Sequence, residues 1–385
     1  EIESKGFRLS AQLDKVLTGK YTAFPAFFCI IAAIMYITFG PVGSFLSQIM
    51  ERFTDFVTTS IDHCLMTYGL NTAVHSLIVD GICAGVGSVL SFLPMILVLF
   101  FLLSLLEDTG YMARVAFVMD KALRKIGLSG RSFVPMLIGF GCSVPAVMAA
   151  RTLPSERDRK MTILLTPFMS CSAKLTIYAF FTAAFFKENQ VLVVIGLYII
   201  GITVGIIFAL IVRTFFFKGN PIPFVMELPN YRFPSLVNIR KLIFMKAKDF
   251  VTQAFTVIFF ATIVIWFLQA FDLQLNFVDT PANSMLSDLG DFLSPIFSPL
   301  GMTDWRISTA FISGFMAKES VISTFSVLLN GSLLSSCFNQ LTAFVFLVFC
   351  LLYTPCIATI AAVKRELGKR YAVGVVILQC TIAWV

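Results

Sequence analysis

Seven long apolar runs are the feature that most limits how this sequence can fold. A helix that crosses the roughly 30 Å hydrocarbon core of a bilayer needs about 20 apolar residues. The chain is also 58% hydrophobic and only 13% charged, which is more apolar surface than a soluble domain can bury. We therefore expect an all-α, polytopic membrane protein. The expected spans are residues 21–39, 82–106, 161–186, 190–212, 250–271, 341–363 and the run that starts at residue 371.

The positions of Lys and Arg predict how these spans are oriented, because short cytoplasmic loops carry an excess of basic residues. Five segments hold 24 of the 29 Lys and Arg residues, so we expect these segments, and with them the N-terminus, on the cytoplasmic side. The segments between them on the other side are poor in basic residues and are expected outside. The five basic segments are 1–20, 107–131, 151–160, 213–248 and 364–370.

Two further apolar stretches, residues 132–150 and 307–329, carry glycine near their middle and do not have the pattern of simple spans. The first lies between two basic segments that share the cytoplasmic side, so it must enter the membrane and return on that side. The second lies between two segments poor in basic residues, so by the same argument it enters from the outside. We therefore expect two re-entrant helical hairpins.

The two hairpins and the spans that follow them resemble each other. Gly139 in the first hairpin corresponds to Gly314 in the second, and the spans that follow contain matching breaks at Pro167 and Pro355. Because the hairpins are expected to enter from opposite sides, this is an inverted repeat, which is typical of secondary transporters whose substrates bind among broken helices near the midplane. The alternative is that the two prolines are ordinary packing kinks.

Thiols lie at three of these helix breaks. Cys142 is at the tip of the first hairpin, and Cys171 and Cys356 follow the two proline breaks. A lone membrane cysteine is more often a small apolar filler, so the argument depends on finding three of them at breaks. Thiol, thioether, hydroxyl and carboxylate groups suit a transition-metal dication better than magnesium or calcium. The candidate metal-binding residues are Cys142, Cys171, Cys356, Met169, Ser143, Ser170, Ser172, Thr354 and Glu319.

Two lysines, Lys174 and Lys318, fall inside apolar segments, where a charge is costly and is usually functional. They are candidates for setting the electrostatics of the site, and they would also suit an anion instead of a metal. The plainer alternative is that they neutralise an acid or bind helix carbonyls. We expect Lys318 to turn towards backbone carbonyls, Glu319 to face the cavity and Lys174 to pair with Glu319.

The rest of the chain divides around these elements. Residues 44–62 are amphipathic and are expected to lie flat on the outer interface. The sequence begins at Glu1 and ends within an apolar run, so we expect a fragment of a longer chain. The expected organisation is a cytoplasmic junction at 1–20, a first span with the amphipathic helix at 21–81, a first repeat at 82–212, a Pro-rich cytoplasmic loop at 213–249, and a second repeat with an acidic external loop at 250–385.

Several motifs resemble those of the membrane domain of ferrous iron transport protein B, the bacterial FeoB family. They are "GFGCSVPAVMAARTL", "PFMSCSAKLTIY", "FVMELPNYRFP" and "GFMAKESV", and the resemblance covers nearly the whole chain. The family's cysteines match Cys142 and Cys171, and its Lys-Glu pair matches Lys318 and Glu319. Lys174 departs from the arginine that the family pattern would have at that position.

This resemblance implies an Fe(II) importer of the bacterial inner membrane with two Gate repeats and a fold similar to that of concentrative nucleoside transporters. In the family a cytoplasmic GTPase domain of the same polypeptide precedes the first span, so GTP and Mg²⁺ are expected on that domain only. No GxxxxGK[ST] motif occurs in these residues, and no enzyme activity or resident cofactor is expected of them. The implied partners are Fe(II), the lipid bilayer and small Feo accessory proteins, with a homo-oligomer left open.

Two other functions remain open from the residues alone. A solute or nucleoside carrier of the same fold would bind its substrate through polar side-chain pairs at the hairpin tips instead of thiols. A membrane scaffold with Gate repeats would not transport at all. A nucleic-acid partner is not expected, because the basic residues follow the membrane topology.

Overall fold

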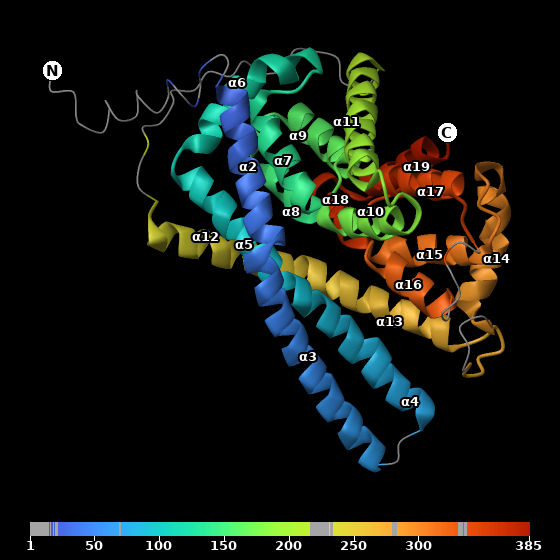
Figure 1. The fold of residues 1–385 in the computed structure, drawn as a ribbon. Coiled ribbons are helices and arrows are strands. Elements are labelled where there is room, and N and C mark those ends of the chain that lie inside the picture. Colours follow the sequence, from blue (N-terminus) through green and yellow to red (C-terminus); the bar gives the residue numbers. More distant parts are fainter. Residues whose placement is uncertain are drawn as a thin grey trace, which may run out of the picture.

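Figure 1 shows the computed structural model, in which helices make up the regular structure of the described residues. One isolated bridge joins Phe271 to Phe277. The expected all-α fold is confirmed, whereas most of the predicted junction at 1–20 lies outside the described residues. Residues 216–230, 232 and 233 of the predicted Pro-rich loop at 213–249 also lie outside them, and from residue 236 that segment is helical. The structure describes residues 15, 17, 19, 22–68, 71–215, 231, 234–278, 283–329, 334 and 337–385.

The N-terminal helices form a long antiparallel pair (Figure 1). One arm consists of α2 and α3, and the other of α4, the π-helix η1 and α5; α3 packs along α5. A proline within α5, Pro94, does not end that helix. The bounds are α2 Ala23–Phe39, α3 Pro41–Tyr68, α4 Thr72–Ser76, η1 Leu77–Cys83, α5 Ala84–Asp108 and α6 Tyr111–Lys125.

The amphipathic segment does not turn at the end of the first span, and its position on the outer interface stays a prediction. Helix α3 instead continues the direction of α2 (Figure 1). The reason is that backbone hydrogen bonding continues across the junction: the Gly40 N–H donates to the Tyr36 carbonyl at 2.8 Å, and the Ser44 N–H donates to the Gly40 carbonyl at 3.0 Å. The apolar face that suggested an interfacial helix stays exposed along this arm.

The first hairpin and the broken span after it form a first unit, α7 to α10. The hairpin consists of α7 and α8, which pack against each other on either side of a break at Cys142. The broken span consists of α9 and α10, separated by the short helix η4 and an extended stretch. The bounds are η2 Gly130–Ser132, α7 Phe133–Gly141, α8 Ser143–Ala149, η3 Ala150–Thr152, α9 Glu156–Leu165, η4 Thr166–Phe168, α10 Ser172–Phe185 and the unbroken α11 Gln190–Phe215.

The second unit, α15 to α18, has the same order of elements. Its hairpin consists of α15 and α16, and its broken span consists of α17 and α18. Helices α12 and α13, joined by the π-helix η5, run into it from the first unit. The bounds are α12 Leu236–Phe250, η5 Val251–Phe255, α13 Thr256–Ala270, α14 Met285–Phe297, η7 Ser298–Leu300, α15 Trp305–Met316, α16 Ser320–Leu329, α17 Gln340–Leu352, α18 Ile357–Leu367 and α19 Lys369–Trp384.

Five helical stretches within the described residues are long and apolar enough to cross a membrane, and the apolar α13 is shorter. They coincide with five of the expected spans, and α13 and α19 coincide with the other two. The chain is therefore a multi-pass membrane protein. That the hairpins re-enter the membrane, and from opposite sides, stays a prediction. The five stretches are Ala23–Thr67, Thr72–Asp108, Glu156–Phe185, Gln190–Phe215 and Gln340–Leu367.

An aromatic core joins the two units. The ring of Phe181 on α10 lies 4.6 Å from that of Phe346 on α17 and 5.9 Å from that of Phe325 on α16, measured between centroids. Helix α8 of the first unit also packs on α18 of the second. Each offset or edge-on aromatic pair contributes about 0.5–1.5 kcal/mol beyond its buried area, so the rings strengthen the contact between the units on the α10–α17 side.

Candidate functional site

A cavity of about 160 Å³ lies where the four helix breaks of the two units meet. The breaks are at Cys142, at 169–171, at 317–319 and at 353–356, and residues of all four take part in its wall or lie directly behind it. The apolar remainder of the wall comes largely from α5 and from the α12–α13 arm. Two segments about 200 residues apart in sequence are thus brought to one point. The candidate residues in the wall are Cys142, Ser143, Cys171, Ser172, Lys174, Lys318, Glu319 and Cys356.

Close backbone packing holds the breaks in place in both units. A Cβ atom on Gly139 would lie 3.4 Å from Met169, in the break of the first broken span. A Cβ atom on Gly314 would lie 2.4 Å from Val321 and 2.5 Å from the Tyr353 hydroxyl, in the break of the second. The second distances are shorter than Cβ contacts in proteins, so any larger residue at 314 would force the side chains of Val321 and Tyr353 to move. The two glycines that correspond in the sequence therefore make corresponding contacts.

Each thiol occupies the residue before the first turn of a helix. Cys142 precedes α8, Cys171 precedes α10 and Cys356 precedes α18, all three with a non-helical backbone. The free N–H groups and the dipole at a helix N-terminus favour negative charge, and the thiolate is the form of cysteine that binds metals. The N-terminus of a helix therefore faces each thiol and offsets part of the cost of burying a thiolate.

The donors line the cavity without forming a ready ligand set. Among the residues that the structure describes, no three His, Cys, Asp or Glu side chains lie close enough together to hold one metal ion. The Cys356 thiol lies 3.2 Å from the Thr359 hydroxyl, which gives it a local partner. The side chains in the cavity wall are therefore not arranged as a closed coordination sphere.

The remaining predicted ligands have structural contacts. Ser172 lines the cavity and donates to the Gly141 carbonyl at 3.1 Å, which ties the hairpin tip to the broken span. Ser170 is buried, with its hydroxyl 3.3 Å from that of Tyr178. Met169 and Thr354 are also buried, and neither they nor Ser170 are in the wall of the cavity.

Lys174 binds the carbonyl ends of both broken helices, and the expected pairing with Glu319 is wrong. Its ammonium donates to the carbonyls of Pro167 at 2.8 Å, Met169 at 3.2 Å and Leu351 at 2.8 Å. The first two carbonyls end the first half of one broken span, and Leu351 lies in the last turn of α17, the first half of the other. Helix C-termini attract cations, so the charge is used within the protein. Lys174 therefore no longer supports an anion, and that alternative now depends on Lys318 alone.

Lys318 has the opposite environment, and the expectation that it would bind backbone carbonyls is also wrong. Its ammonium lies 3.0 Å from the centroid of the Tyr353 ring. Within the described residues that ammonium has no hydrogen-bond partner. Lys318 is only 2% exposed, so its amino group is buried over the face of the Tyr353 ring in the geometry of a cation–π contact. Glu319 lines the cavity, and among the described residues it forms no ion pair with either lysine.

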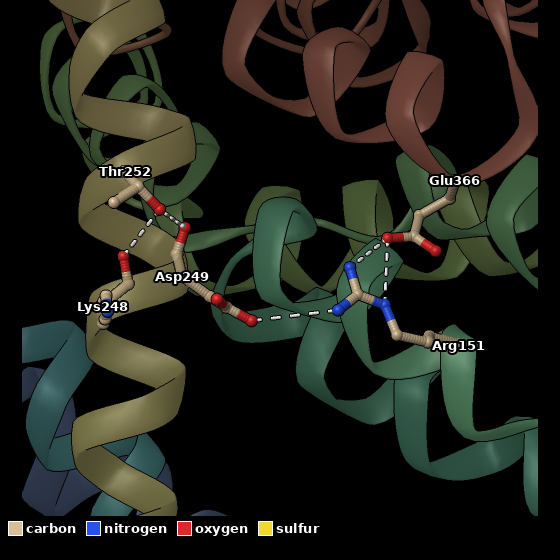
Figure 2. Close-up of polar contacts among 5 residues, drawn as sticks. All are labelled: Arg151, Lys248, Asp249, Thr252 and Glu366. Carbon is tan, nitrogen blue, oxygen red and sulfur yellow. Dashed lines mark hydrogen bonds and ion pairs between the residues drawn. The ribbon is translucent and has the colours of Figure 1, made fainter.

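The sequence analysis missed a polar contact that joins the two units at one end. Arg151 follows the first hairpin, and its guanidinium pairs with Glu366 at the end of α18 and lies 3.8 Å from Asp249 at the end of α12 (Figure 2). The hydrogen bond to Glu366 raises the pKa of Arg151, so the guanidinium stays charged. Its partners lie about 100 and 200 residues away, and no local pattern in the sequence could have indicated them.

Comparison with known proteins places this fold and cavity in a family. The family model described as Gate, nucleoside recognition, matches residues 89–185 and 251–370, and each matched segment contains one hairpin and one broken span. The chain therefore belongs to the Gate family of membrane proteins. A second model, ferrous iron transport protein B C terminus, matches residues 194–246. The resemblance to the membrane domain of ferrous iron transport protein B is confirmed.

The chain is also similar to curated proteins that are named Fe(2+) transporters. The chain is 41% identical to the Fe(2+) transporter FeoB of Staphylococcus aureus over 93% of its own length and 55% of that protein. It is 36% identical to the Fe(2+) transporter FeoB of Methanocaldococcus jannaschii over 97% of its length and 57% of that protein. The chain thus spans about half the length of the curated relatives it matches. No solved structure matches it significantly.

Proposed function

We propose that this chain is the transmembrane permease part of a transporter that moves Fe(II) inward. The observation that carries the proposal is that three thiols from three helix breaks line one cavity, in a chain that matches proteins named Fe(2+) transporters. Fe(II) accepts thiolate, carboxylate and hydroxyl ligands together. Cys142 and Cys171 act as transient ligands, with Cys356, Glu319 and nearby hydroxyl groups in support.

The broken helices give this permease its moving parts. The breaks lie between the two units, so a change in the relation of the units would open the cavity first to one side and then to the other. Weak binding suits such a cycle, because the ion must leave as well as enter. We further propose that the chain lies in a bacterial inner membrane with its N-terminus in the cytoplasm, as the distribution of basic residues predicts.

The energy supply and the partners are proposed to lie outside the described residues. A GTPase domain of the same polypeptide would bind GTP and Mg²⁺, which leaves this chain without a catalytic role. One relative, from Porphyromonas gingivalis, is named a fusion of Fe(2+) transport protein A and Fe(2+) transporter FeoB, and it is 33% identical over 98% of this chain. That name supports a small accessory protein as a partner of the permease.

A carrier of nucleosides or other organic solutes is the alternative that the family description suggests. Such a substrate needs hydrogen-bonding pairs fixed at the hairpin tips, whereas the first tip here presents a thiol. Protection of thiols from alkylation separates the two functions. A metal dication in the cavity should protect Cys142 and Cys171 from a maleimide, and a nucleoside should not.

Iron uptake by the full-length protein in proteoliposomes tests the proposal directly. We expect Fe(II) to accumulate in vesicles that contain the protein and GTP, and not in vesicles without the protein. Uptake of a nucleoside in place of Fe(II), or no uptake of either in the presence of GTP, would refute the proposed function.

Cysteine labelling tests the proposed topology of the first hairpin. Ala122 on α6 and Thr152 after α8 are both exposed and flank the hairpin. If the hairpin re-enters the membrane, a cysteine at either position reacts with a membrane-impermeant maleimide from the same, cytoplasmic side. Reaction from opposite sides would mean that the hairpin crosses the membrane.

A further inference from the structure

A second cavity, of about 330 Å³, adjoins the thiol cavity. Its wall comes from η1 and the start of α5, from α13, and from α15 and α16. Four residues belong to the walls of both cavities: Ile258, Thr262, Ala317 and Ser320. Hence only a thin partition, which includes two hydroxyl side chains, separates the second cavity from the thiols.

The wall of the second cavity presents acceptors instead of donors. It contains seven Ser and Thr residues, one carboxylate and no Lys or Arg. Most of these hydroxyls donate their hydrogen bond to a backbone carbonyl of their own helix. Thr309 donates to the Trp305 carbonyl at 3.0 Å, Ser313 to the Thr309 carbonyl at 3.0 Å, and Thr324 to the Ser320 carbonyl at 2.7 Å. Each oxygen then offers only lone pairs to the cavity, which suits a cation and its water.

The single carboxylate is held in a defined position. Asp80 lies in the π-helix η1, where it accepts a hydrogen bond from the Ser76 hydroxyl at 2.8 Å. The Trp266 indole in turn donates to the Ser76 oxygen at 3.0 Å. Within the described residues no Lys or Arg pairs with Asp80, so its charge is available to the cavity. Single π-turns inside α-helices frequently mark functional sites.

The approach of α5 to α13 at the partition requires glycine. A Cβ atom on Gly85 would lie 2.3 Å from the Thr262 hydroxyl oxygen, and one on Gly81 would lie 3.2 Å from the Trp266 ring. These two glycines lie four residues apart on the side of the η1–α5 stretch that packs against α13. The α13 side of the partition, Ile258 and Thr262, is therefore held against α5, and its other side, Ala317 and Ser320, belongs to the tip of the second hairpin.

We propose that this second cavity is a vestibule that binds a hydrated divalent cation, with Asp80 as its charged anchor, and passes the ion to the thiol cavity. The volume is ample, since a buried water needs about 10–15 Å³ of such space. The segments 40–81 and 272–306, which lead into its wall, are poor in basic residues, so the vestibule opens to the outside. The proposal rests on the proposed function for the identity of the ion.

Transport kinetics of the full-length protein test the anchor. Asp80→Asn keeps an acceptor for Ser76 and removes the charge, so we expect the KM for Fe(II) to rise about five-fold at low salt with little change in maximal rate. Asp80→Glu should restore a KM near that of the unchanged protein. Asp55→Asn removes an exposed carboxylate on α3 outside the vestibule and serves as the matched control. Added NaCl should raise the KM of the control but hardly that of Asp80→Asn.

A binding measurement keeps this test separate from the proposed function. Trp266 lines the vestibule, so bound Mn²⁺ should quench its fluorescence in protein whose other Trp residues are replaced by Phe. Quenching should persist when Cys142 and Cys171 are both changed to Ser and should weaken about five-fold in Asp80→Asn. Equal quenching and equal KM in Asp80→Asn and Asp55→Asn would overturn the vestibule. Absent Fe(II) uptake with normal, Asp80-dependent quenching would overturn the proposed function alone.

Discussion

The two hairpins place different chemistry on the same backbone plan. The first tip presents Cys142. The carbonyl of Gly141 in this tip accepts a hydrogen bond from the Ser172 hydroxyl of the following broken span. The second tip presents Lys318 and Glu319 in an extended turn, and Lys318 rests on the ring of Tyr353. One tip is fixed by a directional hydrogen bond, and the other by a contact that tolerates sliding. The second hairpin is therefore the better candidate for the element that moves when the cavity opens.

The two buried lysines differ in the same way, since one has directional hydrogen bonds and the other has none within the described residues. Lys174 in the first unit makes three directional hydrogen bonds that span both units. Lys318 in the second unit makes one cation–π contact. Equal charge and near-equal burial thus give unequal contributions to rigidity, because the number of fixed partners differs.

Loss of a cavity thiol should have the largest effect. We expect Cys142→Ser and Cys171→Ser each to reduce Fe(II) uptake more than ten-fold, since each removes a thiolate ligand. The double variant should be little worse than either single one, because both residues act on one ion. Cys380→Ser, which changes an exposed thiol on α19, is the control. Normal uptake by the double variant would leave the cysteines as packing residues.

The lysines offer the sharpest test of the comparison. Lys174→Met leaves three buried carbonyls without a donor, and we expect it to lower the free energy of unfolding by about 3 kcal/mol. Lys318→Met replaces a cation that lacks hydrogen bonds by an apolar chain of similar length, so we expect a change within about 1 kcal/mol. Thermal unfolding in detergent measures both. Equal losses would show that the two lysines do not differ as described.

Glu319 should have an intermediate effect on transport. We expect Glu319→Gln to reduce Fe(II) uptake several-fold and Glu319→Asp to reduce it less, because only the first removes the charge that faces the cavity. Glu188→Gln, at an exposed loop position, is the matched control. If both Glu319 variants take up iron like the control, the carboxylate has no part in the site.

The contact between Arg151 and Glu366 should have the smallest effect on stability. The Arg151 side chain is 43% exposed and that of Glu366 is 8% exposed, so water still screens the pair on the Arg151 side, and we expect a contribution of about 1 kcal/mol. A double-mutant cycle with Arg151→Gln and Glu366→Gln should give a coupling energy of about 1 kcal/mol that falls with added salt. A coupling of several kcal/mol would mean that this end of the molecule is locked as firmly as the Lys174 contact.

Much of the fold could be predicted because the bilayer limits it so strongly. Apolar runs gave the spans, and Pro167 and Pro355 gave the two breaks, since proline removes a backbone donor wherever it falls. The meeting of Cys142, Cys171 and Cys356 at one cavity followed from the repeat.

The remainder depends on contacts that a sequence does not encode locally. That Lys174 binds helix carbonyls was one of the alternatives, but its partner in the second unit could not be predicted, because Leu351 becomes its neighbour only in the folded chain. The hydroxyls of the second cavity look like ordinary helix residues when read one helix at a time. The direction of α3 relative to α2 could not be predicted either, because an amphipathic pattern shows which face of a helix is apolar but not the direction of its axis.

The contact of Lys174 with both broken spans has a consequence for the order in which the protein is made. Leu351 is synthesised 177 residues after Lys174, so the third carbonyl arrives only when α17 has entered the membrane. Until then the first unit holds an ammonium in the bilayer with two partners instead of three. The first unit therefore lacks one contact of Lys174 while the second unit is being synthesised, and α17 supplies that contact.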